Sequence, residues 1–265
     1  MRFWNPMATT RDQGKAEQDL AVESAPGKDP AQWIAGLVRH GDERLARLGG
    51  AAVAGVVVAF VALYAFAVLA DQVLEQQTAA LDNSTLELMR RFASPQLTLV
   101  ARIISLFGSE LVWVVGVILL GVFAWQRRWG AALMLTLVAG GAQLLNDVLK
   151  EVFHRARPES VQAIINAQQF SFPSGHAMVS AAFYLYLAYL TWRLVRDWWR
   201  AVLILGLVVL VLLIGLSRIY LEAHYLSDVI AGYLVGVLWT DALILGSHGL
   251  KRRTQRRLRQ RTLAG

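Results

Sequence analysis

The sequence contains no cysteine, and only 17% of its 265 residues are charged. The absence of cysteine excludes disulfide bonds and thiolate metal sites. The shortage of charge says more about the class of protein, because a soluble domain usually has about a quarter of its residues charged. Together with a hydrophobic content of 56%, it favours an integral membrane protein.

Six long apolar stretches account for this composition. A helix needs roughly 20 mostly apolar residues to cross a bilayer core of about 30 Å, and backbone groups in lipid must pair within the segment. The stretches therefore predict an all-α, polytopic membrane protein, and Gly232 and Gly236 form a GxxxG pair suited to close packing inside the bundle. The predicted spans cover approximately residues 50–70, 109–126, 130–149, 175–194, 200–217 and 225–246.

The segments around the spans predict three parts of the chain. Residues 1–48 have no sustained apolar face and are expected to form a partly flexible cytoplasmic leader. Residues 49–248 form the predicted six-helix transmembrane domain, with one or two amphipathic helices at the outer membrane surface at about 72–106. Residues 249–265 form a basic cytoplasmic tail.

The basic residues outside the spans predict the orientation. They occupy four regions that fall on one side of the membrane if six spans alternate, and the positive-inside rule makes that side cytoplasmic. We therefore expect a multi-pass protein of the cytoplasmic (inner) membrane with both termini in the cytoplasm. These residues are Arg39, Arg44, Arg47, Arg127, Arg128, Arg193, Arg196, Arg200, Lys251, Arg252, Arg253, Arg256, Arg257, Arg259 and Arg261.

The net charge of +7 also raises the question of nucleic acid as a partner. A basic tail directly after a helix is explained by topology and by contact with anionic lipid headgroups. No nucleic-acid-binding module is recognisable, so the expected partners are the lipid bilayer and a lipid substrate. The sequence indicates no particular oligomeric state.

The connection before the last span carries a histidine and a carboxylate at helical spacing. His224 and Asp228 lie four residues apart and therefore share one face of a helix. A carboxylate beside an imidazole fixes its tautomer and stabilises the imidazolium, which suits a histidine nucleophile or base. Ser217 and Arg218 lie just before this turn and can bring a guanidinium to the same place. A purely structural His–Asp pair would leave Arg218 unexplained.

The fourth span begins with Pro173-Ser174-Gly175-His176. Ser174 is a suitable helix cap, and a helix N-terminus offers free N–H groups and partial positive charge to an anion. Gly175 permits a phosphate to approach the backbone closely. His176 could then donate a proton to a departing alkoxide as general acid. Taken alone, these four residues indicate only the start of a helix.

Two further cations follow the third span. Lys150 ends that span and Arg157, next to Pro158, lies seven residues later. A guanidinium offers a planar fork to phosphate oxygens and an ammonium offers a point charge, although Lys150 alone could be a snorkelling lysine. His154 and Arg155 are assigned to the connecting loop.

Alternating topology places these three stretches together at the outer face of the membrane. Cations, backbone amides and two histidines can then surround one phosphoryl group, whose transfer depends mainly on positioning and charge stabilisation. Either histidine could be the nucleophile on these grounds.

The motifs resemble those of the type 2 phosphatidic acid phosphatase superfamily, KxxxxxxRP, PSGH and SRxxxxxHxxxD. Lys150–Pro158, Pro173–His176 and Ser217–Asp228 match every specified position. The number of spans and the order of the motifs resemble the integral-membrane branch of that family.

The resemblance implies a role for each residue. His224 would attack phosphorus and become a phosphohistidine, Asp228 would support it, and His176 would protonate the leaving oxygen. No metal and no cofactor are implied. The implied phosphate-binding residues are Lys150, Arg157, Ser174, Gly175 and Arg218.

The expected function is hydrolysis of a lipid phosphomonoester or diphosphate, with phosphatidic acid, phosphatidylglycerol phosphate and polyprenyl diphosphate as candidates. A phosphotransferase that passes the group to another lipid or sugar is the close alternative. An anion transporter would also place charges in a membrane, but it has no use for the His224–Asp228 pair. A metal-dependent hydrolase is disfavoured because the neighbouring cations would repel a divalent metal.

Overall fold

The computed structural model describes residues 30–158 and 170–264, and every regular element in these ranges is an α-helix. The all-α prediction is confirmed, while residues 1–29 of the predicted leader lie outside the described residues. The chain divides into two compact units, Met1–Val53 and Ala54–Gly265. The helices are α2 (Pro30–Leu74), α3 (Ala79–Arg91), α4 (Pro95–Leu106), α5 (Glu110–Trp125), α6 (Trp129–Phe153), α8 (Gly175–Leu194), α9 (Asp197–Tyr220) and α10 (Leu226–Ala264).

Five helical segments among the described residues are long and apolar enough to cross a membrane. The segment predicted at 109–126 begins at Pro95 instead, because α4 continues into α5 across a short turn. The fourth predicted span, α8, is not among the five. The segments are Ala52–Leu74, Pro95–Trp125, Trp129–Phe153, Asp197–Tyr220 and Leu226–Gly249.

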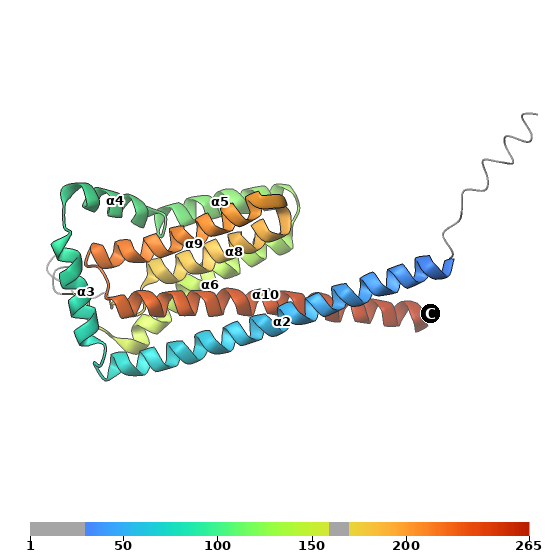
Figure 1. The fold of residues 1–265 in the computed structure, drawn as a ribbon, viewed down its shortest axis with the longest axis horizontal. Coiled ribbons are helices and arrows are strands. Elements are labelled where there is room, and N and C mark those ends of the chain that lie inside the picture. Colours follow the sequence, from blue (N-terminus) through green and yellow to red (C-terminus); the bar gives the residue numbers. More distant parts are fainter. Residues whose placement is uncertain (1–29, 159–169, 265) are drawn as a thin grey trace, which may run out of the picture. The chain divides into compact units, whose positions relative to one another are not determined.

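The position of α8 explains its composition. It packs against α6, α9 and α10, between which it lies in Figure 1. Its residues 177–184 are all buried, including Ser180 and Tyr184. A helix enclosed by protein does not need the continuous apolar surface that contact with lipid requires. Its mean hydropathy can therefore be lower than that of a lipid-facing span.

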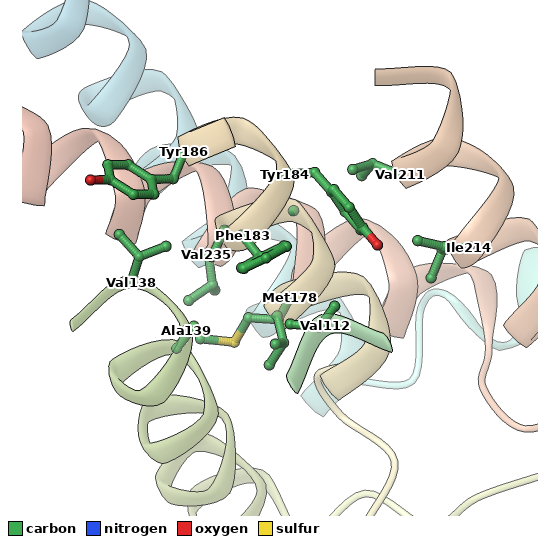
Figure 2. Close-up of a cluster of buried hydrophobic side chains, with 14 of the residues drawn as sticks. Val112, Val138, Ala139, Met178, Phe183, Tyr184, Tyr186, Val211, Ile214 and Val235 are labelled. Atoms are coloured by element: carbon green, nitrogen blue, oxygen red, sulfur yellow. The ribbon is translucent and has the colours of Figure 1, made fainter. Parts of the chain in front are cut away.

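The main core forms around α8. Figure 2 shows side chains of neighbouring helices gathered about Met178, Phe183 and Tyr184. The labelled neighbours come from α5, α6, α9 and α10: Val112, Val138, Ala139, Val211, Ile214 and Val235. This packing holds the ends of four helices in fixed register, and those ends carry the three sequence motifs.

The segment between the first two apolar stretches contains two helices. Ser94 caps α4, because its side chain accepts a hydrogen bond from the backbone N–H of Leu97 at 3.3 Å. Helix α4 packs against α9, and α3 contacts both α9 and α10. In Figure 1, α3 lies across the end of the bundle at which α9 ends and α10 begins.

The GxxxG pair of α10 faces α8 of the same chain, as predicted. A Cβ atom added at Gly232 would lie 2.7 Å from the carbonyl oxygen of Ser174. One added at Gly236 would lie 2.6 Å from the carbonyl oxygen of Met178. These backbone atoms cannot move aside cheaply, so the two helices approach this closely only because both residues are glycine.

Gly236→Ala should therefore destabilise the protein by about 1–3 kcal/mol, the usual cost of overpacking a core. The measurement is thermal unfolding of the purified protein in detergent. Gly246→Ala is the matched control, since it lies on the same helix with no atom within 4 Å of the added Cβ. Equal melting temperatures for the two variants would contradict the packing described for α8 and α10.

Candidate active site

The three motifs meet at one end of the bundle. Helices α6 and α9 end there, and α8 and α10 begin there. The backbone N–H of Ser174 donates to the carbonyl oxygen of Asp228 at 2.9 Å, which joins the start of α8 to α10. Arg157 donates from Nη1 to the carbonyl oxygen of Ala223 at 3.5 Å, which joins the loop after α6 to the turn before α10.

His176 belongs to this group. Four titratable side chains of the motifs are close enough to interact with it electrostatically: Arg218, His224, Lys150 and Arg157. The structure therefore brings all the cations and both histidines of the predicted site together. We call the set formed by Lys150, Arg157, Ser174, Gly175, His176, Arg218, His224 and Asp228 the phosphate socket.

His224 is almost completely buried, and its Nδ1 has two candidate acceptors. The carbonyl oxygen of Ser171 lies 2.9 Å from Nδ1, and Oδ2 of Asp228 lies 3.6 Å from it. The hydrogen-bond acceptor is therefore the Ser171 carbonyl, while Asp228 supplies a negative charge at ion-pair distance. With its proton on Nδ1, the imidazole keeps a free lone pair on Nε2, the nitrogen available for attack.

Burial lowers the pKa of His224 to about 4. Arg157 and Arg218 lower the pKa further, and Asp228 opposes them. The neutral imidazole, which is the nucleophilic form, is therefore the resting state at neutral pH.

At pH 5.5 an ordinary histidine is mostly protonated, whereas His224 should remain neutral and titrate only near pH 4. The pKa of His224 is lower in the folded protein than in the unfolded protein. The unfolded protein therefore takes up the proton first, and the folded protein loses stability progressively as pH falls below about 6.5. NMR of histidine-labelled protein in detergent measures this directly, with the signal assigned by its loss in His224→Asn. A midpoint at or above 6.5 would refute this description of the site.

Ser174 departs from its predicted role as a helix cap. It occupies the N-cap position of α8, but its side chain makes no capping hydrogen bond. Its Oγ is buried and has no hydrogen-bond partner among the described residues. A buried hydroxyl costs free energy unless it is paired, so Oγ is a donor suited to a ligand at the N-terminus of α8.

Gly175 makes room for a close contact between the start of α8 and α6. A Cβ atom there would lie 2.9 Å from Oδ1 of Asn146 on α6. The Nδ2 of the same buried Asn146 donates to the carbonyl oxygen of Pro173 at 3.2 Å. Asn146 therefore holds the start of α8 against the end of α6, close to Lys150.

Arg218 reaches the socket from the end of α9. Its Nη1 donates to Oγ of Ser105 on α4 at 2.7 Å, which fixes one edge of the guanidinium. Its Nε is buried without a hydrogen-bond partner among the described residues. A guanidinium held on one edge with an unpaired N–H on another can bind a phosphate oxygen without reorganising.

Sequence reasoning missed two charged residues at this site, Arg155 and Asp82. Arg155 was assigned to the loop, yet its Nη1 lies 2.6 Å from Oδ1 of Asp228. Its Nη2 lies 2.7 Å from Oδ2 of Asp82, which comes from α3. No local pattern in the sequence marks either residue, because Arg155 is one of several basic residues in its connection and Asp82 lies 73 residues away from it.

Comparison with known proteins identifies the family. A protein-family model described as the PAP2 superfamily matches residues 129–251. Decaprenylphosphoryl-5-phosphoribose phosphatase of Mycobacterium tuberculosis is 31% identical over 166 residues, covering 62% of this chain and 87% of that protein. The chain belongs to the PAP2 superfamily.

Two further comparisons, one of sequence and one of structure, lead to a phosphatidylglycerophosphate phosphatase of Bacillus subtilis. Phosphatidylglycerophosphatase B of Bacillus subtilis is 37% identical over 138 residues, which cover 51% of this chain and 64% of that protein, slightly less than two thirds of its length. The crystal structure of a transmembrane PAP2 type phosphatidylglycerolphosphate phosphatase from Bacillus subtilis superposes with a TM-score of 0.66 at 29% identity, covering 73% of this chain and 98% of that one. The fold is therefore that of a membrane PAP2 protein.

Proposed function

We propose that this PAP2 protein is a membrane lipid phosphatase that hydrolyses a lipid phosphomonoester or diphosphate. The observation that carries the proposal is the buried His224, with Nδ1 bound to the Ser171 carbonyl. It lies in a socket with Lys150, Arg157 and Arg218, at the end of helices apolar enough to span a membrane. The names of its relatives, which are phosphatases of phosphatidylglycerophosphate and of a decaprenylphosphoryl sugar, support a lipid-linked substrate.

In the first step, Nε2 of His224 attacks phosphorus and the bond from phosphorus to the lipid oxygen breaks. His176 gives its proton to the departing alkoxide, and the negative charge of the bound phosphate favours the protonated form of His176 beforehand. The product is a phosphohistidine whose Nδ1–H remains on the Ser171 carbonyl, with Asp228 near enough to stabilise the positive charge of the ring.

In the second step, neutral His176 removes a proton from a water molecule, whose oxygen attacks phosphorus. The bond from phosphorus to Nε2 breaks, and His224 returns to its neutral form. Lys150, Arg157 and Arg218 with the N-terminus of α8 stabilise the charge on the phosphoryl oxygens in both steps.

The proposed topology counts α8 as a sixth span, with the socket on the extracytoplasmic face and both termini in the cytoplasm of an inner-membrane protein. The distribution of basic residues supports it. Because the chain has no cysteine, single-cysteine variants test it cleanly. A membrane-impermeant thiol reagent should label Ser84→Cys of α3 in intact cells and leave Gln126→Cys, after α5, unlabelled; the reverse pattern would overturn the orientation.

A phosphate-release panel tests the proposed activity. The purified protein in detergent is given phosphatidic acid, phosphatidylglycerol phosphate, undecaprenyl diphosphate or a soluble phosphate ester, each with and without chelator. Release from at least one lipid, unchanged by chelator, is expected. Substrate loss without phosphate release, dependent on an added acceptor, would indicate phosphotransfer instead, and loss of activity with chelator would contradict the metal-independent mechanism.

A further inference from the structure

Helix α3 contributes a buried carboxylate that the reaction described above does not use. Asp82 is 1% exposed, although α3 lies in a connection outside the apolar segments. Its Oδ1 accepts from the backbone N–H of Ser227 at 3.0 Å, and its Oδ2 accepts from the Ser227 hydroxyl at 2.6 Å. A buried charge is expensive unless it is paired, and Asp82 is paired both with these groups and with Arg155.

Arg155 connects Asp82 to the carboxylate beside the proposed nucleophile. Its Nη2 donates to Oδ2 of Asp82 at 2.7 Å, and its Nη1 donates to Oδ1 of Asp228 at 2.6 Å. The guanidinium also lies over the ring of Tyr225, 4.5 Å from the ring centroid. A guanidinium held by two carboxylates and an aromatic face has little freedom to move.

This arrangement controls how Asp228 meets His224. Arg155 engages Oδ1 of Asp228 and so leaves Oδ2 directed to the backbone N–H of Tyr225, at 3.0 Å, and to Nδ1 of His224, at 3.6 Å. If Arg155 were paired with Asp228 alone, its full positive charge would oppose the positive charge that His224 gains on attack. Asp82 neutralises part of that charge, because it binds the other arm of the same guanidinium.

We propose that Asp82 is a positioning residue for the His224–Asp228 pair and acts through Arg155. This inference rests on the proposed phosphatase function and extends it, because it makes α3 a component of the active site. The sequence of contacts runs from Asp82 to Arg155, then to Asp228 and to His224. The charge of Asp82 supports the transition state for attack and leaves the binding of ground-state substrate nearly unchanged.

A purely structural role for Asp82 is the competing explanation. Its two hydrogen bonds to Ser227 attach α3 to the first turn of α10, where a carboxylate is favourable. Asp82→Asn separates the two roles, because asparagine keeps the shape and a carbonyl oxygen acceptor but removes the charge. Ser227→Ala removes the hydroxyl, which donates to Oδ2 of Asp82 and accepts from Nη1 of Arg155 at 2.7 Å, and leaves all three charges in place.

The test compares the kinetics of these variants on the lipid that the phosphate-release panel identifies. Asp82→Asn should lower kcat about tenfold, as is typical for residues that orient a reacting group, with KM within twofold of the wild type. Ser227→Ala should lose less kcat than Asp82→Asn. Glu87→Gln is the matched control on α3, since Glu87 is 67% exposed and pairs with Arg91, and it should behave as the wild type.

Coupling to Arg155 is the second readout. Because Asp82 acts through Arg155, the double variant Asp82→Asn/Arg155→Gln should lose no more kcat than Arg155→Gln alone. Full additivity of the two losses, or wild-type kcat in Asp82→Asn, would overturn the proposal. Asp82→Glu keeps the charge if the asparagine variant does not fold; it should retain at least about a third of kcat, and a folded Asp82→Glu with a tenfold loss would count against the proposal.

Oxyanion binding distinguishes failure of this inference from failure of the proposed function. Vanadate can bind a nucleophile in the five-coordinate geometry of the transferring phosphoryl group, whereas inorganic phosphate resembles the ground state. Asp82→Asn should weaken vanadate binding about tenfold and change phosphate binding less than twofold, whether or not the panel contains the physiological lipid. Equal effects on both anions would overturn the positioning role, while inactivity of the wild type on every lipid would count only against the phosphatase.

Discussion

His224→Ala should abolish phosphate release, with kcat lower by about 10⁴-fold or more, as when the nucleophile of a covalent mechanism is removed. The variant retains Lys150, Arg157 and Arg218, so binding of inorganic phosphate should be weakened much less than kcat. The structural basis is the proposed role of Nε2 of His224 as the attacking atom, with Nδ1 held at 2.9 Å from the Ser171 carbonyl. The measurement is phosphate release by purified protein, with thermal unfolding as the check on folding.

His154→Asn is the matched histidine control at the same end of the bundle. The His154 side chain is 60% exposed. Its backbone has a left-handed φ of 45°, a conformation that asparagine also adopts readily. It should keep wild-type activity, and a His224→Ala protein that still released phosphate within tenfold of the wild type would exclude His224 as nucleophile.

The second large effect is expected at Asp228. Asp228→Asn keeps the size of the side chain but removes the charge 3.6 Å from Nδ1 of His224. It should lower kcat by about 10²- to 10⁴-fold, because the imidazolium formed on attack loses its counter-charge. It also leaves Arg155 with Asp82 as its remaining carboxylate partner among the described residues, so the melting temperature should fall moderately.

Asp147→Asn is the control for that substitution. Asp147 is exposed on α6 and accepts a hydrogen bond from Nε2 of Gln143 at 2.9 Å. Loss of its charge should lower kcat far less than loss of the Asp228 charge, because Asp147 interacts with Lys150 whereas Asp228 interacts with His224 itself. Comparable losses in the two variants would mean that overall negative charge, and not the position of Asp228, determines the rate.

Much of this site was accessible from the sequence because its chemistry is local. His224 and Asp228 are one helical turn apart, Ser174 and His176 flank a helix start, and each motif falls beside the end of an apolar stretch. Spacing and topology therefore suffice to bring these residues together at one end of the bundle. The assignment of His224 as nucleophile needed the family resemblance, because either histidine can attack phosphorus in principle.

The contacts that sequence reasoning missed join parts of the chain that are far apart. Asp82 contacts Ser227 at a separation of 145 residues, and it is an acidic residue on the same helix, α3, as the exposed Glu87. Only the placement of α3 across the start of α10 buries one and exposes the other. The role of the Ser171 carbonyl likewise cannot be predicted from the sequence, because every residue has the same backbone acceptor whatever its side chain.

The membrane spans show a second limit of prediction from the sequence. Hydropathy measures what lipid requires, and five helical segments among the described residues meet that requirement, whereas α8, predicted as a span at 175–194, does not. Helix α8 is surrounded by α6, α9 and α10. Its side chains are therefore suited to packing against protein and to forming the socket at its N-terminus. The most central helix is therefore the one that composition identifies least well.

Direct detection of the covalent intermediate is the sharpest test of the proposed mechanism. Purified protein is mixed with lipid substrate carrying ³²P in the transferred group, quenched with alkali within a single turnover, and digested for mass spectrometry. A phosphohistidine at His224 predicts base-stable, acid-labile label on the peptide that contains His224, absent from His224→Ala and trapped at a reduced level in Asp228→Asn. Label on His176 or on any other side chain, or a full turnover with no labelled protein, would contradict it.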